Sequence, residues 1–269
     1  MLPKSNLHTH TTFSDGRDAA EKVVGAALRL GFHTLGFSDH GAAPYDDAAM
    51  PRQAIPAYRA EILRLKRKYA GHIHLRLGIE RDWLSGLALS DYDYAIESVH
   101  YVRHGCDLLA VDYSREVLLR AIQTHFSGDP YAFCRAYFRT VAESARGGAD
   151  ILGHMELVMK FNERRDIFDD ADPRYLGPAL EAADAAADSG MIVEINTGAI
   201  ARGYRTQPCP GPAILRRLAL RRVPVILNSD CHNSADLDCG FQTAASLARA
   251  CGFKTALQAK GDSFEEYPL

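Results

Sequence analysis

Short runs of apolar and β-branched residues alternate with amphipathic stretches from one end of this chain to the other. Eight such runs are predicted to be buried strands: Ser5–His10, Thr34–Ser38, His74–Ile79, Tyr94–Val99, Asp150–Gly153, Ile192–Ile195, Val225–Asn228 and Thr255–Gln258. Parallel strands need a crossover of a dozen or more residues between them, which is usually a helix. The alternation therefore predicts an α/β protein with a mainly parallel sheet.

The stretches between these strands carry apolar residues at three- and four-residue steps, as an amphipathic helix does. Seven helices are predicted on this basis: Ala19–Leu30, Ile55–Tyr69, Arg115–Phe126, Tyr131–Arg146, Pro173–Ser189, Gly211–Arg221 and Ser234–Cys251. About seven βα units favour either a closed TIM-like barrel or an open doubly wound sheet, and strand count alone does not separate the two. Because no flexible linker or repeat divides the 269 residues, one domain spanning residues 1–269 is expected.

Composition excludes several classes of protein. With 47% hydrophobic and 24% charged residues the chain is expected to be globular, and its formal net charge of −3 gives no basic bias toward nucleic acid. No apolar run reaches the length of a membrane span and no signal peptide opens the sequence, so a cytoplasmic protein without a membrane partner is expected. The six cysteines stand singly and are expected to be reduced. No glycine-rich phosphate-binding motif occurs.

Polar residues that can bind metal recur where six of the predicted strands end. Residues two apart in a strand point to the same face, so His8 and His10 present their imidazoles side by side. Asp15 follows after a stretch that can turn back over the strand end. Nine residues share this placement: His8, His10, Asp15, His40, Glu80, His100, His154, Asp230 and His232.

Each of these residues has an ordinary structural explanation when it is taken alone. A single histidine at a strand end is commonly hydrogen-bonded scaffolding, and Asp15 fits an Asx-turn. The separate explanations do not account for six strand ends that are each followed by a residue able to bind metal. The carboxyl ends of parallel strands meet at one face, and ligands bind at that face. Nine such groups packed together without cations would bury repelling carboxylates and unpaired imidazoles. The set therefore predicts bound metal, and nitrogen and oxygen ligands without thiolate suit Zn, Fe or Mn.

The order of these motifs along the chain resembles the polymerase and histidinol phosphatase (PHP) superfamily. The motifs are His8-Thr9-His10 with Asp15, Ser38-Asp39-His40, Gly78-Ile79-Glu80, Ser98-Val99-His100, Gly153-His154 and Ser229-Asp230-Cys231-His232. Within the superfamily, the stretch from Glu194 to Gly198 and Tyr101 after the fourth motif are similar to the stand-alone histidinol-phosphatases.

The resemblance implies a distorted seven-stranded (β/α) TIM-like barrel with three divalent metal ions at its C-terminal face. The superfamily accepts either His or Asp at the Asp15 position, so the second site would be richer in oxygen here. The ligand sets that the resemblance implies are His8, His10, Glu80 and Asp230 for one ion; Asp15, His40 and His232 for a second; and Glu80, His100 and His154 for a third.

The resemblance also implies hydrolysis of a small-molecule phosphate monoester, L-histidinol phosphate above all, by a metal-bound hydroxide that attacks phosphorus in line. Asp230 and His232 are the candidates for moving protons. Lys160 and Arg202 are the candidates for binding phosphate oxygens, with Arg205 as the alternative to Arg202. The loop Gly41–Met50 follows a predicted ligand and is a candidate cover for the substrate.

Two other functions stay open at this stage. The chain could act on nucleotides or nucleic-acid ends, as other members of the superfamily do, or it could be a metal-binding barrel without activity. The basic runs Arg64–Lys68 and Arg216–Arg222 do not decide for nucleic acid, because solvated helix faces carry such charges routinely. The filled ligand set argues against an inactive barrel. No nucleic-acid partner is expected.

Overall fold

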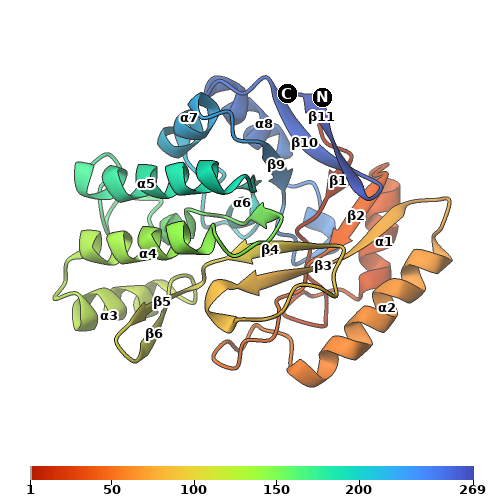
Figure 1. The fold of residues 1–269 in the computed structure, drawn as a ribbon, viewed down its shortest axis with the longest axis horizontal. Helices are drawn as coiled ribbons and strands as arrows, with labels where there is room; N and C mark the ends of the chain where they lie inside the picture. Colours follow the sequence, from red (N-terminus) through yellow and green to blue (C-terminus); the bar gives the residue numbers. More distant parts are fainter. Residues whose placement is uncertain (1) are drawn as a thin grey trace.

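The computed structural model, which describes residues 2–269, is built around a sheet of nine strands that curls on itself (Figure 1). Neighbouring strands pair in parallel from the first to the eighth, and the last strand adds antiparallel to the edge. The strands in spatial order are β1 (Ser5–Asn6), β2 (Thr34–Phe37), β3 (His74–Asp82), β4 (Tyr94–Ser98), β7 (Ile151–Leu152), β8 (Ile192–Asn196), β9 (Val225–Asn228), β10 (Thr255–Lys260) and β11 (Ser263–Pro268).

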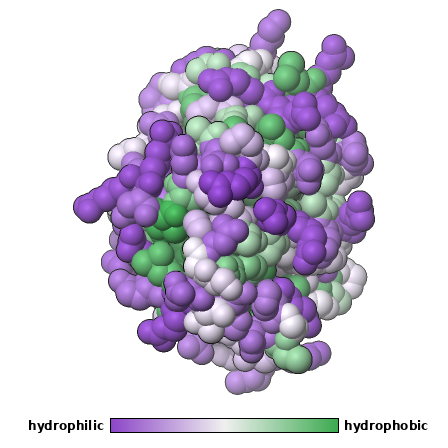
Figure 2. Space-filling model, turned by 90° about the vertical axis from the view of Figure 1, so that its left-hand side faces the viewer, coloured by the Kyte–Doolittle hydropathy of each residue, from purple (hydrophilic) through white to green (hydrophobic). Residues whose placement is uncertain are grey.

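Helices cover the outside of the sheet, which confirms the predicted barrel-like α/β architecture (Figure 1). The α-helices are α1 (Ala20–Arg29), α2 (Ile55–Lys68), α3 (Arg115–His125), α4 (Pro130–Ser144), α5 (Pro173–Ser189), α6 (Gly198–Ala201), α7 (Pro212–Leu220) and α8 (Phe241–Ala250). Each long helix buries an apolar stripe and leaves its polar side outward. Figure 2 shows the consequence on one side of the molecule, where the surface is mostly hydrophilic and apolar residues form small separate groups.

The two ends of the curled sheet meet where β1 lies beside β10. The backbone N–H of Ala259 donates to Ser5 Oγ at 3.0 Å. Beyond the end of β1 the chain continues alongside the end of β9, where His10 N donates to Cys231 O at 2.9 Å. This closure brings the first strand end and the last site-bearing strand end together, although more than 200 residues separate them in sequence.

Several elements differ from the sequence prediction. A two-stranded hairpin, β5 (Tyr101–His104) and β6 (Asp107–Ala110), follows β4 and was not predicted; nor was β11. Between β3 and β4, where no helix was predicted, the chain forms one short 3₁₀ turn, η2 (Trp83–Ser85). The predicted helix Ser234–Cys251 is wrong in its first half: a 3₁₀ turn, η4 (Ser234–Asp236), is separated from α8 by Gly240, whose φ is +74°.

Tyr94 fills the inside of the barrel beneath the strand ends. Its ring lies against the backbones of β2 and β3 at Gly36 and Gly78, and its hydroxyl donates to Leu7 O at 2.5 Å. A Cβ added at either glycine would overlap the Tyr94 side chain. The two glycines therefore leave the space that one buried tyrosine occupies.

We expect Gly78→Ala to lower the free energy of unfolding by about 1–3 kcal/mol, because overpacking forces the ring or the strand to shift. Gly177→Ala in α5 is the matched control, since a Cβ added there meets no atom within 4 Å and alanine favours a helix by about 1 kcal/mol over glycine. Denaturant unfolding of both variants measures the difference. Equal stability of the two would contradict the packing argument.

Two further predictions from the sequence concern the oxidation state of the cysteines and membrane-spanning helices. All six cysteines are free, as expected for reduced thiols. Within residues 2–269, no helix combines the length and the apolar character that crossing a bilayer requires.

Candidate metal centre

The nine residues singled out from the sequence come together at the C-terminal ends of the parallel strands. Eight of them follow the end of a strand, whereas Glu80 lies inside β3, which continues to Asp82. They form four overlapping groups whose ligand atoms lie within 4.8 Å of one another: His10, Asp15, His40 and His232; His8, His10 and Asp230; His8, Glu80 and His154; and His40, Glu80 and His100. The division among ions that the resemblance implies stays a prediction, because these groups share members.

Glu80 stands at the middle of this cluster and is fully buried. Its Oε2 lies 2.9 Å from His40 Nδ1 and 3.2 Å from His8 Nε2. Its Oε1 lies 2.9 Å from His154 Nε2 and 3.4 Å from His100 Nε2. One carboxylate therefore faces histidines from four different strand ends, which is the geometry of a bridging ligand.

A second part of the cluster is formed by the turn after β1 and the turn after β9. Asp15 Oδ2 lies 3.0 Å from His232 Nε2, and His10 Nε2 lies 3.2 Å from Asp230 Oδ1. The rings of His10 and His232 stack with their centroids 4.1 Å apart. Asp230 has a φ of +48°, a left-handed conformation that is rare for a residue with a side chain and that clusters at functional sites.

The position of Asp15 depends on a buried carboxylate that the sequence analysis quoted without assigning it a role. Asp39 Oδ1 accepts hydrogen bonds from Thr11 N at 2.8 Å and from Ser14 Oγ at 2.7 Å. These bonds hold the turn that follows His10 and carries Asp15 toward His232. The motif Ser38-Asp39-His40 thus contributes one residue to the cluster and one to its support.

Charge is divided unevenly among the clustered histidines. Burial lowers the pKa of His10 to about 3, helped by the neighbouring His232 and His40. Burial opposes protonation of His40 too, but the carboxylates of Glu80 and Asp15 raise its pKa to about 9. The surroundings thus shift the pKa values of two neighbouring imidazoles in opposite directions, His10 downward and His40 upward.

The clustered residues fit a metal centre because several of their buried side-chain atoms lack hydrogen-bond partners. Several fully buried side-chain atoms have no hydrogen-bond partner among the described residues: His8 Nε2, His10 Nδ1 and Nε2, Glu80 Oε2, His100 Nδ1 and His154 Nδ1. Buried polar groups are almost always satisfied in native proteins, so this concentration needs an explanation. Among them, His8 Nε2 and His10 Nε2 lie 3.2 and 3.4 Å from Glu80 Oε2. Imidazole and carboxylate atoms that converge in this way suit Zn, Fe or Mn.

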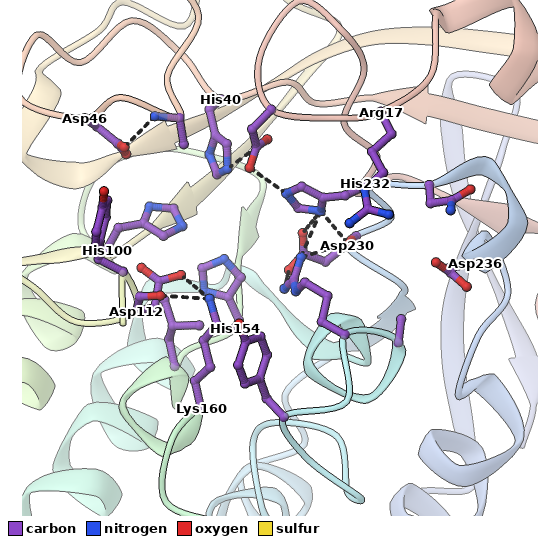
Figure 3. A pocket seen from close by; sticks show the side chains of 18 of the residues that line it. Arg17, His40, Asp46, His100, Asp112, His154, Lys160, Asp230, His232 and Asp236 are labelled. Atoms are coloured by element: carbon purple, nitrogen blue, oxygen red, sulfur yellow. Dashed lines mark hydrogen bonds and ion pairs between the residues drawn. The ribbon is translucent and has the colours of Figure 1, made fainter. Parts of the chain in front are cut away.

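Six of the nine residues, Asp15, His40, His100, His154, Asp230 and His232, line a cavity of about 590 Å³ that opens to the surface (Figure 3). Arg202 lies in its wall, where Nη2 donates to Asp230 Oδ2 at 2.9 Å and Nη1 donates to His232 Nδ1 at 2.8 Å. Arg205, the alternative left open by the sequence, does not line the cavity; it pairs with Glu163 at 3.1 Å instead. Of the two arginines, Arg202 is therefore the one placed to meet a ligand.

Lys160 also lines the cavity, but its charge is already paired. Its Nζ donates to the carbonyl O and to Oδ2 of Asp112, both at 2.9 Å. The loop Gly41–Met50 borders the same space through Asp46 and Ala48, as a covering loop requires. Asp112 was missed by the sequence analysis because nothing near it in the chain indicates its distant partner.

A second missed carboxylate supports the His100 side of the cluster. Asp82, at the end of β3, accepts the Tyr45 hydroxyl at 2.6 Å through Oδ1 and the His100 backbone N–H at 2.9 Å through Oδ2. It therefore connects the covering loop with a residue of the cluster. Its position two residues after Glu80, on the same face of the strand, is the sequence signal that could have found it.

Comparison with known proteins agrees with this geometry. The family model described as the PHP domain matches residues 6–198. The chain belongs to the PHP domain family. It is 32% identical to a probable histidinol-phosphatase of Deinococcus radiodurans, covering 94% of this chain and 95% of that one. It is 25% identical to the histidinol-phosphatase of Bacillus subtilis, covering 92% of this chain and 100% of that one.

The PHP fold is also seen in a solved structure. The histidinol phosphate phosphatase of Lactococcus lactis, crystallised with zinc, L-histidinol and phosphate, superposes with a TM-score of 0.70 at 20% identity. The match covers 98% of this chain and 100% of that one. The fold is therefore shared over nearly the whole length of the chain.

Proposed function

We propose that this PHP-domain chain is a metal-dependent phosphatase that hydrolyses L-histidinol phosphate to L-histidinol and phosphate. The observation that carries the proposal is the convergence of nine imidazole and carboxylate side chains, several with unpaired buried atoms, six of which line one open cavity. The relatives over nearly the full length are named histidinol-phosphatases, which supports the choice of substrate. The proposed phosphatase domain is the whole chain, residues 1–269, of which Met1 lies outside the described residues.

The proposed cofactors are three divalent cations. The nine clustered residues are proposed as their ligands, with Glu80 as the bridge. Zinc is the first candidate, because the Lactococcus lactis protein holds it, and iron and manganese suit the same nitrogen and oxygen donors. Divalent cations here supply water activation near neutral pH and neutralise charge on the phosphate oxygens and on the leaving alkoxide.

The role proposed for Arg202 is to bind a phosphate oxygen. A histidine that gives its Nε2 lone pair to the cluster carries its proton on Nδ1, and His232 Nδ1 has an acceptor for that proton, the Asp230 carbonyl, at 3.0 Å. In this tautomer His232 cannot also accept from Arg202. The guanidinium then has donors free for phosphate, which its planar fork recognises well.

Lys160 is proposed as a second phosphate contact. Both cations pair with a carboxylate, Lys160 with Asp112 and Arg202 with Asp230, but an ammonium lacks the planar fork that makes arginine the stronger phosphate contact. Asp230 and His232 are the candidates for moving a proton from the attacking water to the leaving alkoxide, since both line the cavity beside the cluster. We also propose that the enzyme acts in the cytoplasm, where its six free cysteines stay reduced, and that it has no nucleic-acid partner.

A substrate panel tests the proposed function directly. Purified protein supplied with zinc or manganese is assayed for phosphate release from L-histidinol phosphate, a 3′,5′-bisphosphonucleotide, an aryl phosphate and a short DNA. The highest kcat/KM is expected for L-histidinol phosphate. Preference for the nucleotide or DNA would assign the chain to the other class of substrate. Full metal occupancy without phosphate release from any compound would leave it a metal-binding barrel.

Arg202→Met is expected to lower kcat/KM for L-histidinol phosphate by about 10²-fold or more, the scale for removing a donor aimed at transition-state charge. Lys160→Met is the comparison and is expected to cost less, because an ammonium does not make the two parallel hydrogen bonds that a guanidinium can make to phosphate. Steady-state kinetics of the two variants give the order. A larger loss for Lys160→Met would reverse the assigned roles.

A further inference from the structure

Glu194 is a fully buried carboxylate that lies beside the cluster but belongs to none of its four ligand groups. It sits in the middle of β8, between β7 and β9, and its register partner in β9 is the apolar residue Ile226. A charged side chain inside a barrel is costly unless every one of its lone pairs is used. Its partners therefore indicate what it is for.

Each oxygen of Glu194 receives two hydrogen bonds. Oε1 accepts from His8 Nδ1 at 2.7 Å and from Asn228 Nδ2 at 3.0 Å. Oε2 accepts from the His154 backbone N–H at 2.9 Å and from Asn196 Nδ2 at 2.9 Å. The carboxylate is fully satisfied, and two of its four donors belong to residues of the metal cluster.

The contact with His8 fixes more than the orientation of the ring. An ionised carboxylate can only accept, so His8 Nδ1 must carry a proton when it bonds to Glu194 at this distance. In the neutral ring the lone pair is then on Nε2, which points toward Glu80 at 3.2 Å and has no hydrogen-bond partner. That is the tautomer a metal ligand needs.

The contact with His154 brings a second strand end into the same arrangement. Glu194 holds the backbone of His154 just after β7, while it holds the side chain of His8 just after β1. These two histidines and Glu80 form one of the four ligand groups. One carboxylate thus sets the spacing between two proposed ligands that are 146 residues apart in sequence.

We propose that Glu194 is a positioning residue for the metal centre, which selects the Nδ1–H tautomer of His8 and places His8 and His154 for the same ion. The inference rests on the proposed metal centre but not on its substrate. Carboxylates that orient metal-binding histidines in this way change metal affinity by about 10–100-fold when they are mutated.

Two replacements of Glu194 separate tautomer selection from packing. Glu194→Gln keeps the size of the side chain but turns an NH₂ group toward His8 Nδ1 or toward the His154 N–H, so one of them loses its acceptor. Glu194→Asp leaves space in the core but presents acceptors alone. Tautomer selection therefore predicts zinc affinity in the order Glu, then Asp, then Gln, whereas packing alone predicts Glu, then Gln, then Asp.

The experiment uses zinc as the probe. Zinc affinity is measured by competition with a chromophoric chelator, and the melting temperature is recorded for each variant with and without zinc. We expect the Glu194→Gln substitution to weaken zinc binding by about 10–100-fold. The melting temperature of this variant is expected to rise less on addition of zinc than that of the wild type. A lower melting temperature of the zinc-free protein, with wild-type zinc affinity, would reduce Glu194 to a structural role and overturn the proposal.

Glu97→Gln is the matched control. Glu97 is also a fully buried carboxylate, in β4, but its partner is the guanidinium of Arg81 and not a histidine of the cluster. Its replacement is expected to leave zinc affinity unchanged even if it lowers stability. Equal loss of zinc in both glutamine variants would show that any buried carboxylate has this effect. Zinc binding by the wild type without turnover of L-histidinol phosphate would reject the substrate and leave this inference standing.

Discussion

Glu80→Gln is expected to abolish hydrolysis of L-histidinol phosphate while the barrel stays folded. The carboxylate faces five histidines from four strand ends at 2.9–3.4 Å, so its loss removes the bridge of the proposed centre. A metal ion contributes several kcal/mol to transition-state stabilisation, which corresponds to a fall in kcat/KM of about 10³-fold or more. Steady-state kinetics and elemental analysis of the variant measure both losses together.

Folding of the Glu80 variant needs to be checked separately, because Glu80 is fully buried. Glutamine keeps the volume, so the far-ultraviolet circular dichroism is expected to match that of the wild type. Glu97→Gln again serves as the control for removing a buried carboxylate, and it is expected to keep its metal and its activity. A Glu80→Gln enzyme with wild-type turnover would disprove the bridging role and the metal-dependent mechanism with it.

The strands were predictable where an apolar run is buried on both faces, because such runs are visible without knowledge of their partners. The hairpin of β5 and β6 was not, since Arg103 and His104 are exposed and the turn depends on Gly105 with a φ of +60°. The start of α8 was missed for a related reason. The apolar spacing continues through Leu237, and only the left-handed backbone at Gly240 shows where the helix begins.

The site was predictable to the extent that it depends on strand direction. Parallel strands place their carboxyl ends together, so a polar residue after each apolar run indicates the cluster without any alignment of the strands. Residues whose role depends on one specific partner were not found this way. Asp112 neutralises Lys160 across 48 residues, and Glu194 reaches His8 across 186 residues. Pairing at such distances is set by the closure of the barrel, which local sequence patterns do not contain.

Removal of metal is expected to abolish activity and to destabilise the fold at the same time. Glu80 and Asp230 are buried carboxylates that both lie close to His10 Nε2. Cations that neutralise the charge of these carboxylates would also hold together the six strand ends that carry the ligands. A ligand at about 1,000 times its Kd stabilises the folded state by about 4 kcal/mol, which for a domain of this size corresponds to a fall in melting temperature on the order of 10 °C when it is removed. Dialysis against a chelator followed by calorimetry and assay measures both effects.

Restoration distinguishes a catalytic centre from a structural one. If the same ions both stabilise the fold and support hydrolysis, adding zinc or manganese to the stripped protein should restore the melting temperature and the activity over the same range of metal concentration. A structural metal alone would restore the melting temperature and leave no activity. Undiminished hydrolysis by a fully stripped protein would exclude the metal mechanism. The side chains that line the cavity would then have to activate water without a cation, although the imidazoles described within residues 2–269 at this site are buried and surrounded by carboxylates.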